Sequence, residues 1–179
     1  MALRTIRGPG DKALFLVAKK VDGINAGTIR LLDDLAETMR DKDGIGLAAP
    51  QLGIAKRIFV VEFEDQFYEM INPYLISYEG DLIDIEGCLS YPGIWAEVSR
   101  PEVITLSAMN REGEDFIVTA EGVLARALMH ELDHLDGNVF IDKVIRFLDP
   151  SELIDEVEEG ASIRAVIEYR RGERNEVSE

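Results

Sequence analysis

Cysteine, histidine and tryptophan are scarce in this chain. Its 179 residues include one cysteine, Cys88, two histidines and one tryptophan. A single cysteine excludes an internal disulfide framework and any zinc module built from several cysteines. A chain that makes no use of disulfides is typical of a reducing compartment, so we expect a cytoplasmic protein.

Positive charge and long apolar runs are also in short supply. Lysine and arginine together number 19 against 35 aspartates and glutamates, which gives a net charge of −16. This balance argues against specific nucleic-acid binding and against a polybasic membrane anchor. The longest early apolar run, residues 13–18, is far shorter than the roughly 20 residues that span a bilayer. We therefore expect neither a membrane partner nor a secretory signal.

The remaining composition is that of a folded globular chain. Hydrophobic residues make up 46% and charged residues 30%, and the length suits one domain. Apolar residues recur at helical spacing over 28–39 and 121–135. The expected strands cover 58–63, pieces of 70–85 broken at Pro73 and Gly80, and a hairpin of 103–109 with 116–119. Because the strands and helices do not alternate regularly, the pattern predicts an α+β fold.

The second expected helix carries the sharpest local pattern, His130-Glu131-Leu132-Asp133-His134. Residues four apart share one face of a helix, with Cβ atoms about 5–6 Å apart. Two imidazoles so placed can chelate one metal ion, and Glu131 can accept a proton from a water at that ion. The alternative is coincidence on an ordinary helix. Both histidines of the chain fall within this pattern, which favours a metal site.

Cys88 is the candidate third ligand, within the string Glu86-Gly87-Cys88-Leu89-Ser90. A metal held by two histidines needs a third protein ligand and keeps one position open for water. The alternative for Cys88 is a small buried hydrophobe. Its polar, turn-forming neighbours and the missing third ligand favour the thiolate ligand, which suits ferrous iron, cobalt or zinc.

A third string, GIGLAAPQ at residues 44–51, follows the first expected helix. Its two glycines allow the backbone to approach a ligand closely. The string lacks the third glycine of a dinucleotide-binding loop and the lysine of a phosphate-binding loop. The glycines alone suit a helix-ending turn, whereas the amide of Gln51 can donate a hydrogen bond to a developing oxyanion.

The three strings together, in this order, resemble the peptide deformylase family, whose motifs read GxGxAAxQ, EGCxS and HExDH. The resemblance covers roughly residues 25–148. It implies small antiparallel or mixed β-sheets packed around a central buried helix that carries HExDH. It also implies a metal-dependent hydrolase that removes the N-formyl group from the N-terminal formyl-methionine of newly made polypeptides. We expect residues 1–150 to form one catalytic domain and 151–179 a C-terminal extension.

The resemblance assigns the metal ligands and the base. Cys88, His130 and His134 would bind one divalent ion, most often ferrous iron (Fe2+), with Zn2+, Ni2+ or Co2+ able to replace it. Glu131 would act as general base and later as general acid. The expected partner is an N-formylmethionyl peptide, and the ribosome exit region is a candidate second partner.

The resemblance also assigns the groups that contact the substrate. The backbone N–H of Leu89 and the side chain of Gln51 would stabilise the tetrahedral oxyanion. Gly46 would contact the substrate backbone. Ile45 and Ala127 would line the pocket for the methionine side chain.

Other residues have supporting roles or depart from the family pattern. Glu86 and Arg100 are expected to form an ion pair near the site, as in the family. Asp133 is either solvated or supports a ligand. Trp95 lies seven residues after Cys88, which favours the pocket wall over the core. Met129 stands where the family usually has a glutamine, which changes the surroundings of the metal and removes no ligand.

Two other functions remain open from the sequence. A zinc endopeptidase of the HExxH type would need a third histidine or glutamate ligand and a long peptide cleft. An inactive relative could bind metal or peptide without turnover. Retention of Glu131 and Gln51 argues against the inactive relative, because binding alone requires neither group as a catalyst.

Overall fold

The computed structural model describes residues 2–149 and residue 152. Within this part of the chain the strands form two antiparallel sheets, one with the order β1-β2-β3-β6-β7 and one with the order β4-β5-β8. The strands are β1 (Gly46–Ala48), β2 (Ile58–Phe63), β3 (Gln66–Glu79), β4 (Leu82–Cys88), β5 (Tyr91–Arg100), β6 (Val103–Met109), β7 (Asp115–Glu121) and β8 (Val144–Phe147). The helices are α1 (Ala26–Asp41) and α2 (Gly122–Leu135), with short 3-10 turns η1 (Lys12–Phe15), η2 (Ala49–Leu52) and η3 (Phe140–Lys143).

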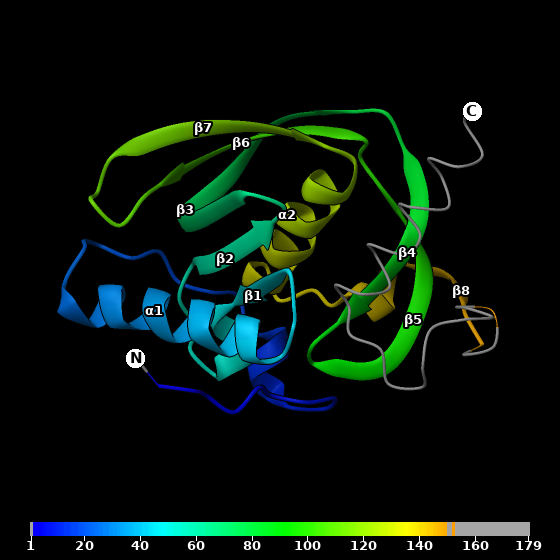
Figure 1. Ribbon diagram of the computed structural model, residues 1–179, viewed down its shortest axis with the longest axis horizontal. Coiled ribbons are helices and arrows are strands. Elements are labelled where there is room, and N and C mark those ends of the chain that lie inside the picture. The colour runs from blue at the N-terminus through cyan, green and yellow to red at the C-terminus, as the bar shows by residue number, and fades with distance from the viewer. Residues whose placement is uncertain (1, 150–151, 153–179) are drawn as a thin grey trace.

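Helix α2 is central and buried, which confirms the expected α+β architecture. Figure 1 shows α2 between the five-stranded sheet and the long hairpin of β4 and β5. Its apolar residues, among them Leu124, Leu128 and Leu132, pack with the inner side chains of β2, β3, β6 and β7 in one hydrophobic cluster. A second cluster joins α1 to β1 and β2. A third cluster belongs to the smaller sheet and contains Cys88.

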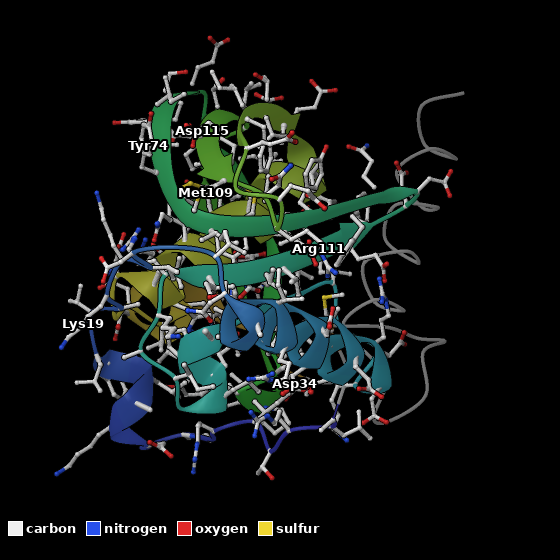
Figure 2. All side chains as sticks on the ribbon, turned by 90° about the vertical axis from the view of Figure 1, so that its left-hand side faces the viewer. Lys19, Asp34, Tyr74, Met109, Arg111 and Asp115 are labelled. Carbon is white, nitrogen blue, oxygen red and sulfur yellow. The ribbon has the colours of Figure 1, made fainter. Side chains whose placement is uncertain are left out.

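Helix α1 begins two residues before the expected start. Asn25 caps it, because its side-chain Oδ1 accepts hydrogen bonds from the backbone N–H groups of Gly27 and Thr28, at 2.9 and 3.1 Å. Arg111 in the β6–β7 turn, which lies close to the beginning of α1, donates to Asp33 of this helix at 2.9 Å and also to Glu69 of β3 (Figure 2). One side chain thus joins three elements that are distant in the sequence.

The expected strand 58–63, the hairpin and the second helix are confirmed. The break expected at Pro73 is wrong, because β3 continues through it. The ladder between β3 and β6 shifts register between Ile71 and Tyr74, and Asn72 has a φ of +51°, so the proline lies at an irregularity of the strand. The expected C-terminal extension, residues 151–179, lies outside the described residues apart from residue 152. Across 2–149 no helix is long and apolar enough to cross a membrane.

Candidate metal centre

Helix α2 presents both histidines on the same side. The helix follows directly after β7 and ends before Gly137, which adopts a φ of +75° just past the last turn. His130 and His134 are buried, and their ring centroids lie 4.9 Å apart. The spacing of four residues therefore brings the two imidazoles together, as the sequence pattern predicts.

Cys88 reaches these histidines from the end of β4. The ladder between β4 and β5 shifts register between Gly87 and Cys88. The Cys88 Sγ lies 3.3 Å from the His134 Nε2, and one ligand atom from each of Cys88, His130 and His134 lies within 4.8 Å of the others. A sulfur and a nitrogen bound to one tetrahedral zinc are about 3.5 Å apart. The three side chains therefore fit a shared divalent cation.

The orientation and charge of His130 also suit a cation. Its Nδ1 lies 2.6 Å from Glu86 Oε1, and a hydrogen bond there leaves Nε2 for a metal. Burial alone would lower the pKa of His130, but the negative charges of Cys88 and Glu86 outweigh it and raise the pKa. His134 Nδ1 is buried and has no hydrogen-bond partner among the described residues. The surroundings thus favour positive charge at His130, whereas burial and the charge of His130 lower the pKa of His134.

Glu86 is the centre of a buried network of charges. Arg100 contacts both of its oxygens, at 2.6 and 3.0 Å, which confirms the expected ion pair. Burial opposes ionisation of Glu86, but His130 and Arg100 hold its pKa well below the usual range. Asp133 receives hydrogen bonds from Arg100 and Lys143 and so supports the network.

Arg126 is a member of this network that sequence reasoning did not single out. It donates to Glu86 Oε2 at 3.0 Å from a position four residues before His130. That spacing places it on the same face as the two histidines, which was the available signal.

The carboxyl of Glu131 lies directly against the backbone of Gly46. A Cβ at position 46 would be 2.4 Å from Glu131 Oε1 and 2.9 Å from its Cγ and Cδ, so a side chain there would displace the carboxyl. Glu131 Oε2 is buried and accepts no hydrogen bond from the described residues. Burial raises the pKa of Glu131 to about 7.

The amide of Gln51 is held in one orientation. Its Oε1 accepts a hydrogen bond from the backbone N–H of Ala48 at 2.8 Å. Its Nε2 donates to Ser90 Oγ at 3.2 Å and lies 3.5 Å from Cys88 Sγ. The N–H groups of this amide therefore point toward the cysteine side of the site.

One cavity joins the expected site residues. Of those residues, Ile45, Gly46, Gln51, Cys88, Leu89, Ala127, His130 and Glu131 line it, and His134 adjoins it through its contact with Cys88. Val123, Ile85 and Arg126 also line it, and no motif had pointed to them. Trp95 does not line this cavity but lies next to Gly87, which does, so its place in the substrate pocket stays a prediction. Its ring covers Gly87, where a Cβ would come within 2.8 Å of it.

The site combines two buried imidazoles, a thiol and a carboxyl beside one cavity, which is the set of groups used by metal-dependent hydrolases of the HExxH type. Comparison with known proteins shows which family of such hydrolases the chain resembles. The sequence model of the polypeptide deformylase family matches residues 3–149. The chain is 53% identical over 153 residues to a peptide deformylase of Acetivibrio thermocellus, covering 86% of this chain and 90% of that protein.

Solved structures agree with the sequence comparison. The crystal structure of peptide deformylase from Thermotoga maritima matches with a TM-score of 0.79 and 36% identity, over 80% of this chain and 99% of that one. A Met-Ala-Ser-bound class I type b peptide deformylase from Acinetobacter baumannii matches with a TM-score of 0.77 and 28% identity, over 80% and 99%. The chain belongs to the peptide deformylase family, whose enzymes remove the formyl group from nascent peptides.

Proposed function

We propose that this chain hydrolyses the formyl group from N-formylmethionyl peptides, with Cys88, His130 and His134 holding one divalent metal ion. The observation that carries the proposal is the convergence of these three buried side chains beside the carboxyl of Glu131 in one cavity. The Met-Ala-Ser bound to the Acinetobacter relative supports a peptide substrate with an N-terminal methionine. A zinc endopeptidase is not favoured, since the described ligand cluster contains a cysteine in place of a third histidine or glutamate.

The metal, when bound, supplies Lewis acidity that lowers the pKa of water and polarises the formyl carbonyl. A thiolate with two imidazoles suits several divalent ions. We propose Fe2+ as the native ion, with Zn2+, Ni2+ or Co2+ able to replace it.

Glu131 moves the proton in the proposed reaction. Its buried Oε2 is available to accept a proton from the attacking water. The water oxygen forms a bond to the formyl carbon, and the bond from that carbon to the peptide nitrogen then breaks. Glu131 passes the proton to the leaving nitrogen, which gives a free amine and formic acid, and the acid leaves as formate after losing its remaining proton to solvent.

Gln51 and Leu89 are the proposed donors to the oxyanion. The amide of Gln51 is already oriented by Ala48 and Ser90, so it loses little freedom when it donates to the substrate. The backbone N–H of Leu89 follows Cys88 directly and would supply the second donor. Removing one such donor typically lowers turnover about 10²–10³-fold.

The substrate would lie along the cavity beside these groups. We propose that Gly46 contacts the peptide backbone and that Ile45 and Ala127 contact the methionine side chain, since all three line the cavity. The small side chain of Ala127 leaves room for a ligand beside α2.

The experiment is a measurement of metal content and formate release on protein purified without oxygen. We expect about one metal per chain and formate from a formyl-methionyl tripeptide. Glu131→Ala should keep the metal and lose most activity, whereas Cys88→Ala should lose both. Absence of formate release after loading with iron, nickel or cobalt would refute the function, and full activity of Cys88→Ala would refute the ligand assignment.

We further propose a cytoplasmic location, because the thiol of Cys88 must stay reduced to hold a metal. The ribosome exit region is a candidate partner, which co-sedimentation with ribosomes would test. We propose that residues 1–150 form one catalytic domain. A chain that ends at residue 150 should therefore retain metal and activity.

A further inference from the structure

The histidines and the cysteine of the proposed metal site belong to different packing units. Helix α2 packs chiefly on β1, β2 and β7 and shares the hydrophobic cluster of the larger sheet. Cys88 belongs to the cluster of the smaller sheet, to which α2 contributes no residue within the described chain. Apolar packing of the helix therefore does not by itself fix the distance from the thiol to the imidazoles.

The closed end of the β4–β5 hairpin has its own attachment to the helix. Cys88 pairs with Tyr91 there, and the Tyr91 ring packs against Phe140 with 5.9 Å between centroids. Phe140 begins η3, soon after the C-terminal end of α2, and its ring also lies 5.9 Å from that of His130. The opposite, open end of the hairpin lies where Leu82 pairs with Arg100.

Arg126 connects α2 to that open end. Its Nη2 donates to the backbone carbonyl of Leu82 in β4 at 2.7 Å. Its Nη1 donates to the carbonyl of Val98 in β5 at 2.9 Å and to Glu86 Oε2 at 3.0 Å. One buried guanidinium thus joins the helix to both strands and to the carboxylate that orients His130.

Arg126 and Arg100 have different tasks at Glu86. Arg100 lies on β5, within the same hairpin as Glu86, and contacts the helix through Asp133. Arg126 comes from the helix itself and contacts the strands through fixed backbone atoms. A buried charge is expensive unless its hydrogen bonds are satisfied, and a planar guanidinium can satisfy three acceptors at once.

We propose that Arg126 is a positioning residue that holds the β4–β5 hairpin, and with it Cys88, at ligand distance from the histidines of α2. The inference rests on the proposed metal site. In this role Arg126 helps the protein to retain a divalent cation. The thiolate ligand comes from the smaller sheet, and the two imidazole ligands come from α2, which packs on the larger sheet. Partners that orient metal ligands typically contribute 10–100-fold to metal affinity.

The test compares Arg126→Met and Arg126→Lys with the wild type, each loaded with Co2+. The first measurement is the rate of metal release to a chelator, and the second is the thiolate-to-cobalt absorption band. We expect Arg126→Met to release metal about 10–100-fold faster and to show a weakened band. Arg126→Lys should behave similarly, because a single ammonium cannot span the carboxylate and two carbonyls.

Two controls separate positioning from general destabilisation. Arg146→Met removes the exposed ion pairs of this β8 residue with Glu97 of β5 and with Glu152, and should release metal at the wild-type rate. Leu128→Ala destabilises α2 from the face that packs on the larger sheet. When the two variants are compared at temperatures equally far below their own Tm values, Leu128→Ala should release metal more slowly than Arg126→Met and keep the cobalt band.

Three results would overturn the proposal. Wild-type release and an unchanged band in Arg126→Met would do so. So would full rescue by Arg126→Lys, which would show that only the charge matters, or equal release by Leu128→Ala. If Arg126→Met does not fold, Arg126→Lys carries the same comparison. Failure of the wild type to bind Co2+ would instead overturn the metal site on which the inference rests.

Discussion

Replacing Gly46 by alanine should displace the carboxylate of Glu131 and slow the reaction about 100-fold. The added Cβ would lie 2.4 Å from Glu131 Oε1, and ordinary contact begins near 3.4 Å, so the carboxylate must withdraw by about 1 Å. The Cγ and Cδ atoms at 2.9 Å move with it, because the side chain is buried and cannot swing into solvent. A misplacement of 1 Å at a reacting group can cost about 10²-fold, or about 2.7 kcal/mol.

The assay is formate release from a formyl-methionyl tripeptide, with kcat and KM determined separately. Metal content should stay near one per chain, since the three atoms nearest to a Cβ at position 46 all belong to Glu131. Because Gly46 is also proposed to contact the substrate, the variant is repeated in a Glu131→Ala background. There the added methyl should have little further effect on kcat.

Two results would refute the reasoning. If Gly46→Ala kept kcat within about threefold of the wild type, the carboxylate would not depend on the missing Cβ. If the methyl lowered kcat by the same factor with and without Glu131, the effect would arise from substrate contact. Either result would show that Gly46 does not position the carboxylate of Glu131.

Three further changes test other parts of the structure. Ser90→Ala removes the oxygen that accepts a hydrogen bond from Gln51 Nε2 at 3.2 Å, so kcat should fall about tenfold with KM little changed. The control Ser99→Ala, at an exposed position of β5, should have no effect on kcat. Equal kcat in both variants would count against the role of Ser90. Asn25→Ala removes the cap of α1 and should cost about 1 kcal/mol, seen as a fall in Tm of about 2–4 °C; an unchanged Tm would contradict the cap. Removing metal with a chelator should lower Tm, since an ion present at about 1,000 times its Kd stabilises by about 4.1 kcal/mol; identical Tm values with and without metal would contradict a buried site.

Features that depend only on residues close together in the sequence could be predicted from the sequence. The four-residue spacing of His130 and His134 places both rings on one helix face whatever surrounds the helix. The strand over 58–63 follows from its β-branched and aromatic residues, and the hairpin from the turn residues at 110–113. The short or irregular strands β1, β5 and β8 had no such local pattern, and their pairing partners stabilise them.

The sequence by itself determined the α+β class, the family resemblance and the identities of the metal-ligand candidates, because those depend on residue type and local spacing. Only the tertiary structure decided that Cys88 lies 3.3 Å from a histidine 46 residues away, that Gly46 faces Glu131, and that Arg126 joins two packing units. The physical reason is that a distance between elements is set by how sheets and helices pack. The sequence does not distinguish a buried arginine such as Arg126 from an exposed one, because its hydrogen-bond partners are distant in the sequence.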